Sequence, residues 1–140
     1  MKVISVNISY IAINELPIYV IYYTVGPVAT GSVRISGGRN IHEGYVEIYQ
    51  NGQWGTICHD SWNLHDGRVV CSQLGYVEVE NVDCCKSTQP KSGPFWIAAL
   101  NCTGSESSIQ NCPGFQWRNV TSTSSCSRNG LNPATVTCAG

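Results

Sequence analysis

The sequence predicts a small disulfide-rich domain of the α+β class, in which a curved β-sheet cradles one main α-helix between long loops. At 140 residues the chain has the length of one domain. Its eight cysteines are an even and high number, which is typical of an extracellular domain stabilised by disulfides. Alternating strand patterns lie on both sides of one segment with helical periodicity. These three observations together define the fold class.

Residues 1–32 differ in composition from the rest of the chain, being apolar, free of cysteine and nearly free of charge. Lys2 and the apolar stretch loosely fit a secretory signal, and the apolar run 16–29 is short for a membrane span. Three polar residues interrupt the apolar part: Asn7, Asn14 and Glu15. We therefore predict that this segment is an atypical signal or signal-anchor. The second choice is a fragment boundary of a larger protein, and the third is an added strand. The domain is expected to occupy residues 33–140.

A short strand is predicted at 32–36, followed by a hairpin. Val46 and Ile48 alternate with polar neighbours, and Asn51-Gly52 is the pair preferred where both turn residues have positive φ. One face of the strand after this turn carries Trp54, Thr56 and Cys58.

The main helix is predicted to follow Asn63, a favourable N-cap residue. Asp66 then lies at the third helical position, where a negative charge suits the helix N-terminus. Gly75 is a natural C-terminal stop. Apolar residues on one face of this helix are Val70, Cys71 and Leu74.

The remaining chain predicts shorter elements. A single-turn helix is expected to start at Ser105, and short strands are expected at 95–102 and 134–138. The segments 77–93 and 113–133 are predicted to be turn-rich loops, because they contain many Gly, Pro, Ser and Asn residues.

Composition excludes several classes of partner. The net charge is −1 and only 12% of residues are charged, which gives no electrostatic case for binding nucleic acid or an anionic membrane surface. Membrane association is expected only through residues 1–32 or through a parent chain. The cysteines include no Cys-x-x-Cys pair, so their spacing favours disulfides over zinc.

Three long segments resemble one known family. "EGYVEIYQNGQWGTICHDSWNLHDGRVVCSQLGY", "GPFWIAALNCTGSESSIQNCPG" and the final "ATVTC" are similar to the scavenger receptor cysteine-rich domain family, over residues 33–138. The resemblance implies the disulfides Cys58–Cys126, Cys71–Cys138 and Cys102–Cys112, the pattern of the six-cysteine subgroup. Cys84 and Cys85 lie outside that pattern. A vicinal disulfide is slightly favoured for them over bonds to another chain or free thiols.

The resemblance implies an extracellular, calcium-independent ligand-binding module of a secreted or membrane protein. Its expected ligands are extracellular proteins, polyanions or microbial surfaces. The alternative is a structural or accessory module within a larger protein such as a multidomain protease or oxidase. Catalysis is not expected, because Cys58 is assigned to a disulfide and the chain lacks a Gly-x-Ser-x-Gly elbow.

The calcium sites of the family are largely missing here. Asp60 is interpreted as a remnant of the first site, in which His59 replaces an aspartate, and Ala98 and Ala99 replace the aspartates of the second. Calcium needs several oxygen ligands, so we expect weak calcium binding or none, and no cofactor. For Asp60 itself, a hydrogen-bonded loop carboxylate is the preferred interpretation over a working calcium ligand.

Five loop residues are candidate ligand contacts: Lys86, Lys91, Trp117, Arg118 and Arg128. The commoner role of such charges is solvation, and packing beneath the disulfides is an equally good interpretation of Trp117 and of Phe115. Asn101 and Asn119 lie in glycosylation sequons.

Overall fold

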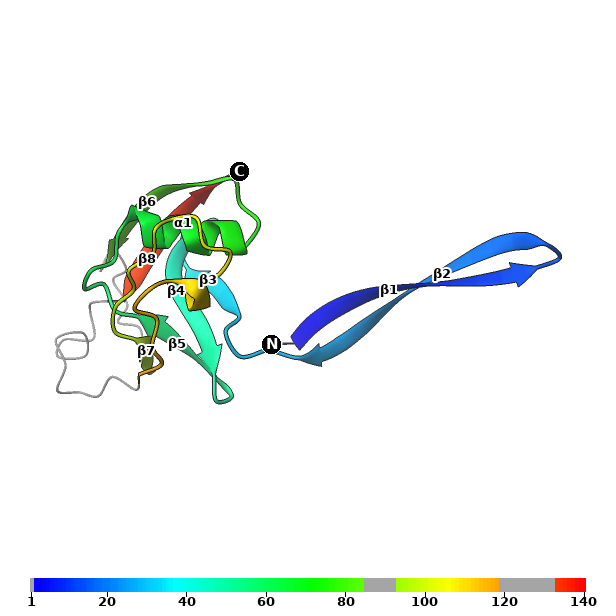
Figure 1. Cartoon of the computed structure of the whole chain (residues 1–140), viewed down its shortest axis with the longest axis horizontal. Coiled ribbons are helices and arrows are strands. Elements are labelled where there is room, and N and C mark those ends of the chain that lie inside the picture. The colour runs from blue at the N-terminus through cyan, green and yellow to red at the C-terminus, as the bar shows by residue number, and fades with distance from the viewer. Residues whose placement is uncertain (1, 85–92, 119–132) are drawn as a thin grey trace.

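The computed structural model describes residues 2–84, 93–118 and 133–140. A two-stranded hairpin projects away from a domain that is built on a six-stranded sheet (Figure 1). No helix in these described ranges is long and apolar enough to cross a membrane.

The N-terminal segment is a β-hairpin. Strands β1 (Lys2–Ile13) and β2 (Leu16–Pro27) pair antiparallel in an unbroken register. Asn14 and Glu15 connect them with φ angles of 50° and 63°, the two positive values of a type I′ turn. An added strand was the last of the three interpretations of this segment, and two strands are found. The signal, anchor and boundary interpretations stay predictions.

The domain sheet has the order β6-β8-β4-β5-β7, and β3 also pairs with β4. All neighbours are antiparallel except β5 and β7, which are parallel. Its strands are β3 (Val33–Gly37), β4 (Glu43–Gln50), β5 (Gln53–Ile57), β6 (Glu78–Cys84), β7 (Phe95–Ile97) and β8 (Ala134–Ala139).

The predicted hairpin and helix are both confirmed. Asn51 and Gly52 have φ angles of 51° and 76° between the paired residues Gln50 and Gln53. Helix α1 (Leu64–Gln73) begins with a reciprocal capping box, in which the Asn63 side chain accepts from the Asp66 backbone and the Asp66 side chain accepts from the Asn63 backbone.

Two predicted elements differ from the structure. The segment 77–93 was expected to be a loop, yet β6 pairs with β8 from Glu78↔Ala139 to Cys84↔Ala134. A register shift between Val79 and Asn81 ends the alternation that begins at Val77 and Val79, so the period of two does not continue along the strand. The expected strand at 95–102 is shorter, because β7 ends at Ile97.

The predicted single-turn helix starts later than expected, as the 3₁₀ turn η1 (Ile109–Asn111). The carboxylate of Glu106 explains the delay. It accepts hydrogen bonds from the Thr103 and Gly104 backbone amides, which folds the preceding residues into a tight loop instead of a helical turn.

The core lies between α1 and the sheet. Its fully buried members include Ile48, Ile57, Val69, Val70 and Ile97. Gly67 lets the helix approach the sheet closely, because a Cβ at this position would collide with the Val82 side chain of β6.

Disulfides connect the core elements. Cys71 of α1 is bonded to Cys138 of β8, and Cys102 is bonded to Cys112, the same pairs that the family resemblance implies. Cys58 is also disulfide-bonded. The expected Cys58–Cys126 and Cys84–Cys85 bonds involve Cys126 and Cys85, which lie outside the described residues, as does the side chain of Cys84.

Candidate ligand-binding site

A groove of about 810 Å³ is lined by residues of the sheet and of the β3–β4 connection. It lies where β4, β6 and β8 run side by side, next to the connection between β3 and β4. Its floor includes buried Tyr45 and the half-exposed Thr135 and Thr137. These side chains offer hydroxyl groups and an aromatic edge to a ligand.

Glycines keep the wall of the groove narrow. A Cβ at Gly38 would overlap the backbone carbonyl of Glu43, and one at Gly44 would overlap that of Ser36. The two strands therefore approach each other here more closely than larger residues permit.

The charges along the groove are mainly negative. Glu43 is paired with Arg39, whose Nε donates to its carboxylate over 2.8 Å. The β6 residues Glu80 and Asp83 add two further carboxylates. Among the described lining residues, carboxylates outnumber cations by three to one, so the groove favours a positively charged ligand.

A smaller pocket of about 150 Å³ lies where the family's second calcium site is expected. It is lined by Ala98, Ala99, Gly114, Gln116 and Arg118. The guanidinium of Arg118 donates to the Gln116 side chain over 3.0 Å. The described lining therefore offers one amide and one cation instead of a set of carboxylates, which does not suit a hard cation.

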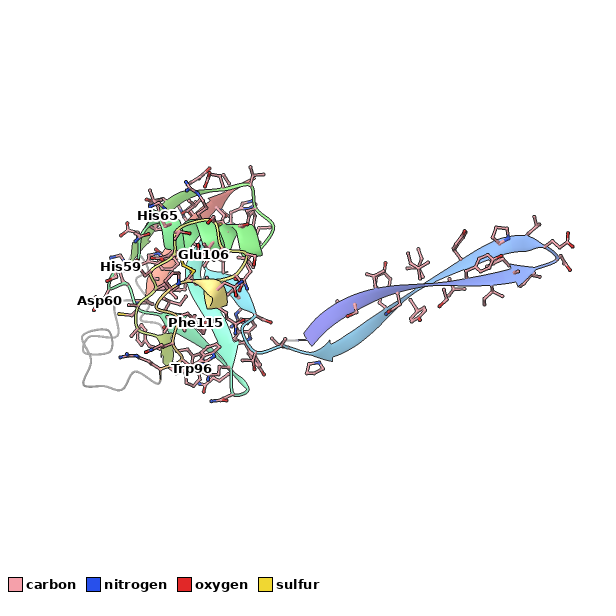
Figure 2. All side chains as sticks on the ribbon, in the orientation of Figure 1. His59, Asp60, His65, Trp96, Glu106 and Phe115 are labelled. Carbon is pink, nitrogen blue, oxygen red and sulfur yellow. A yellow bond between two sulfur atoms is a disulfide. The ribbon has the colours of Figure 1, made fainter. Side chains whose placement is uncertain are left out.

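His59 and Asp60 begin the loop after β5, and Figure 2 shows them at the same end of the domain. Asp60 is exposed, whereas His59 is half-buried. Asp60 interacts with another group, and its role as a loop carboxylate stays a prediction.

The aromatic pair Phe115 and Trp117 is half-buried and packs against the core. Their rings meet edge to face with centroids 5.1 Å apart. Packing therefore accounts for both rings, and a direct role of Trp117 in ligand contact stays a prediction. Lys86, Lys91, Arg128 and Asn119 lie outside the described residues, and Asn101 is exposed.

Two carboxylates organise the loop that contains the Cys102–Cys112 bond. Fully buried Asp66 accepts from the Asn63 and Cys102 backbone amides, each over 3.0 Å, and burial raises its pKa despite these bonds. Glu106 accepts from Thr103 and Gly104, which lowers its pKa to about 2.

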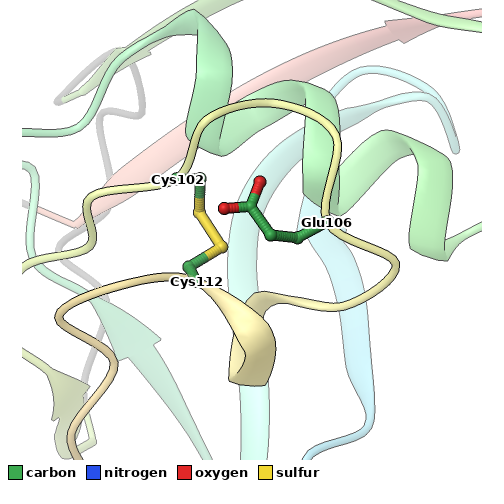
Figure 3. Close-up of side chains that lie close together, drawn as sticks. All are labelled: Cys102, Glu106 and Cys112. Carbon is green, nitrogen blue, oxygen red and sulfur yellow. A yellow bond between two sulfur atoms is a disulfide. The ribbon is translucent and has the colours of Figure 1, made fainter.

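Glu106 also lies beside Cys102 and Cys112 (Figure 3), a grouping that resembles a metal site. Both sulfurs are bonded to each other, so they are unavailable as thiolate ligands. The grouping is therefore part of the loop's structure.

The groove was not predicted from the sequence. Its charged residues come from the β3–β4 connection and from a segment predicted to be a loop, and only the β6–β8 pairing brings them together. Predicting a strand at 78–84 would have brought these residues together. The register shift within β6 is the reason that this strand was not predicted.

Comparisons with known proteins agree on one family. The model of the scavenger receptor cysteine-rich domain matches residues 36–139. The mouse macrophage scavenger receptor types I and II is 46% identical over 107 residues, which is 76% of this chain and 22% of that protein. Mouse lysyl oxidase homolog 2 is 43% identical over 86 residues, which is 61% of this chain and 11% of that protein. The chain thus spans less than a quarter of these curated relatives.

Solved structures are similar over the same region. The third domain of this type in murine neurotrypsin superposes with a TM-score of 0.63 at 31% identity, covering 78% of this chain and 96% of that one. The dimeric form of the domain from mouse MARCO has a TM-score of 0.57 at 34% identity, covering 76% and 94%.

Proposed function

Because the chain belongs to the scavenger receptor cysteine-rich domain family, a family of non-catalytic extracellular modules, we propose that it binds ligands for a larger secreted or membrane protein. The observation that carries this proposal is the groove at β4, β6 and β8. A rigid, disulfide-bonded sheet positions its polar groups, which is what a binding module requires.

The preferred ligand is a basic segment of an extracellular protein. The Arg39–Glu43 ion pair is neutral overall, and Glu80 of β6 adds a carboxylate to the groove lining. Such a surface attracts lysine and arginine side chains and repels polyanions. Polyanionic and microbial-surface ligands are the second choice, and they would bind through exposed cations such as Arg118.

We propose that binding does not require calcium. Support comes from the pocket at Ala98 and Ala99, where the described residues offer a cation and no carboxylate. Asp60 alone would supply too few oxygens for a tight site.

The test measures binding of the full chain to oligolysine and to dextran sulfate, each in calcium and in excess EDTA. We expect oligolysine to bind, with affinity reduced by added salt and unchanged by EDTA. Replacing Glu80→Gln should weaken this binding several-fold. Glu15→Gln is the matched control, because it removes the same charge from the distant hairpin turn and should change nothing.

Three results would contradict the proposal. Binding lost in EDTA would mean that calcium is required. Dextran sulfate binding that is abolished by Arg118→Gln would assign a polyanion as the ligand. Binding to neither probe would favour the accessory role.

An accessory role is the second candidate function, and the similarity to lysyl oxidase homolog 2 favours it. Only 11% of that protein corresponds to this chain, so the matched domain is one part of a much larger protein. In that case the domain would position neighbouring domains. The sequence of the complete transcript separates the two, since a catalytic domain beside residues 33–140 would support the accessory role.

A further inference from the structure

The two faces of the β1–β2 hairpin differ in polarity. Cross-strand partners share a face, so the register assigns each residue to one side. The apolar face carries Ile4, Val6, Ile8, Tyr10, Ala12, Pro17, Tyr19, Ile21 and Tyr23. The mixed face carries Ser5, Asn7, Ser9, Ile11, Ile13, Leu16, Ile18, Val20 and Tyr22.

Polar contacts lie on the mixed face. There the Ser9 hydroxyl donates to the Tyr22 hydroxyl over 3.4 Å. On the apolar face the rings of Tyr10 and Tyr19 lie 5.8 Å apart, between aliphatic neighbours. The apolar face therefore has the composition of a protein core.

This core-like face is open to solvent. Its seven large side chains are 58–67% exposed. Figure 2 shows the hairpin and its side chains projecting away from the domain. Taking about 150–250 Å² for a fully exposed aromatic side chain and less for an aliphatic one, the seven side chains expose roughly 900 Å². Contiguous apolar patches of this size mark interaction surfaces.

The hairpin also needs a partner for its own stability. A single two-stranded hairpin is marginally stable in water, and burial of one face against another element is the usual remedy. An interface of standard size buries about 800 Å² from each partner, which the apolar face alone can provide.

Two observations favour a second copy of this chain over a lipid bilayer. Among the described residues, no further strand pairs with either outer edge of the hairpin, and unpaired backbone groups are costly in hydrocarbon. The only charged residues of the hairpin segment are Lys2 and Glu15, so no basic cluster holds it at an anionic surface.

The apolar face is suited to pair with itself. Ile8 and Ile21 are cross-strand partners near its centre, with Tyr10 and Tyr19 on one side and Val6 and Tyr23 on the other. A two-fold axis through the centre would place aromatic and aliphatic groups of one copy against those of the next, and the nine residues of the apolar face include no charge.

We propose that this chain forms a homodimer in which the apolar faces of two hairpins pack together as a four-stranded sandwich. The ligand groove lies on the separate domain, so such a dimer would present two grooves to one ligand. This arrangement raises avidity without any new contact to the ligand.

The test is sedimentation velocity of the full chain from about 1 to 100 µM, the range in which weak and moderate dimers dissociate. We expect a monomer–dimer equilibrium. Ile8→Lys places a charge at the centre of the interface and should weaken the dimer about tenfold or more. Ser9→Lys is the matched control, because it adds the same charge to the mixed face and should leave the dimer unchanged.

A photo-crosslinking experiment locates the contact without relying on stability. Benzoylphenylalanine replaces either Tyr19 of the apolar face or Tyr22 of the mixed face. Covalent dimers should form from position 19 and not from position 22.

Equal crosslinking from both positions, or a dimer that Ile8→Lys leaves intact, would overturn the proposal in favour of an interface elsewhere. A monomer at every concentration would also overturn it. Co-sedimentation of that monomer with phosphatidylcholine vesicles would then assign the apolar face to lipid. None of these results depends on whether the groove binds a ligand.

Discussion

The hairpin and the domain are stabilised in opposite ways. In the domain, contacts join residues far apart in the sequence, such as Cys71 and Cys138, and the large apolar side chains are mostly buried. In the hairpin, each strand contacts its neighbour across one turn, and thirteen large apolar side chains remain exposed. The domain therefore carries its stabilising contacts within itself, while the hairpin requires a partner.

The largest effect is expected from removing the Cys71–Cys138 bond by changing both residues to Ala. Loss of a bridge that spans 67 residues should lower the free energy of unfolding by about 4 kcal/mol in the loop-closure model. The measurement is urea unfolding followed by tryptophan fluorescence, since all four tryptophans lie in the domain.

The Cys102–Cys112 bond supplies the matched comparison. It spans only 10 residues, so its loss should cost less, about 3 kcal/mol. An equal or larger loss would show that loop length does not govern these bridges. Amide exchange in β1 and β2 should be the same in both variants and the parent.

The second test removes the buried carboxylate of Asp66. Asp66→Ala leaves the Asn63 and Cys102 amides without their acceptor, which should cost about 2–3 kcal/mol. The urea midpoint reports the loss. Glu80→Ala, an exposed carboxylate on β6, is the control and should change stability by less than about 0.5 kcal/mol.

The third test stabilises the hairpin alone. Glu15 has a φ of 63°, a conformation that costs a non-glycine residue about 1 kcal/mol and costs glycine little. Glu15→Gly should therefore slow amide exchange in β1 and β2. The domain turn gives the inverse control, because Gly52→Ala, at a φ of 76°, should weaken the β4–β5 hairpin by a similar amount. Unchanged exchange in β1 and β2 would show that the turn does not limit the hairpin.

The smallest effect is an acid sensitivity confined to the domain. Hydrogen bonds from Thr103 lower the pKa of Glu106 to about 2 from its ordinary 4.5. A lowered folded-state pKa gives stability that is present above pH 4.5 and is lost as the pH falls toward 2. Glu106→Gln should reduce the stability difference between pH 6 and pH 3, as measured by thermal unfolding. An identical pH profile would exclude this role.

Burial of Asp66 acts in the other direction. Its pKa is raised, so its ionisation opposes folding, and this unfavourable contribution shrinks as the pH falls through the folded-state pKa toward the ordinary value of 3.8. Comparing Glu106→Gln with Asp66→Asn therefore separates the two carboxylates, since the two substitutions should change the acid slope with opposite sign.

Local signals predicted the parts of the fold that depend on neighbouring residues. Asn51-Gly52 and the Asn63 cap each act within a few residues, and both were correctly placed. Strand β6 was missed because its register shift at Val79–Asn81 exists only relative to β8. The groove depends on the β6–β8 pairing, so it could not be predicted from the sequence either.

The N-terminal hairpin was missed for a different reason. Its apolar face alternates with a mixed face that becomes apolar near the turn, so the sequence reads as a nearly continuous hydrophobic run. The turn residues Asn14-Glu15 also lack the glycine that marks most type I′ turns. Both features are typical of an anchor as much as of a hairpin.

The distance between Cys71 and Cys138 has a consequence for biosynthesis. Cys138 leaves the ribosome 67 residues after Cys71, a delay of about 3–13 s at ordinary translation rates. The local β1–β2 hairpin can form within about 10 µs of its synthesis. During that interval the apolar face is already assembled while the domain still awaits the Cys71–Cys138 bond. Nascent chains would therefore need chaperones and disulfide isomerases at the same time. Pairing of hairpins from neighbouring ribosomes would compete with aggregation of the exposed apolar faces.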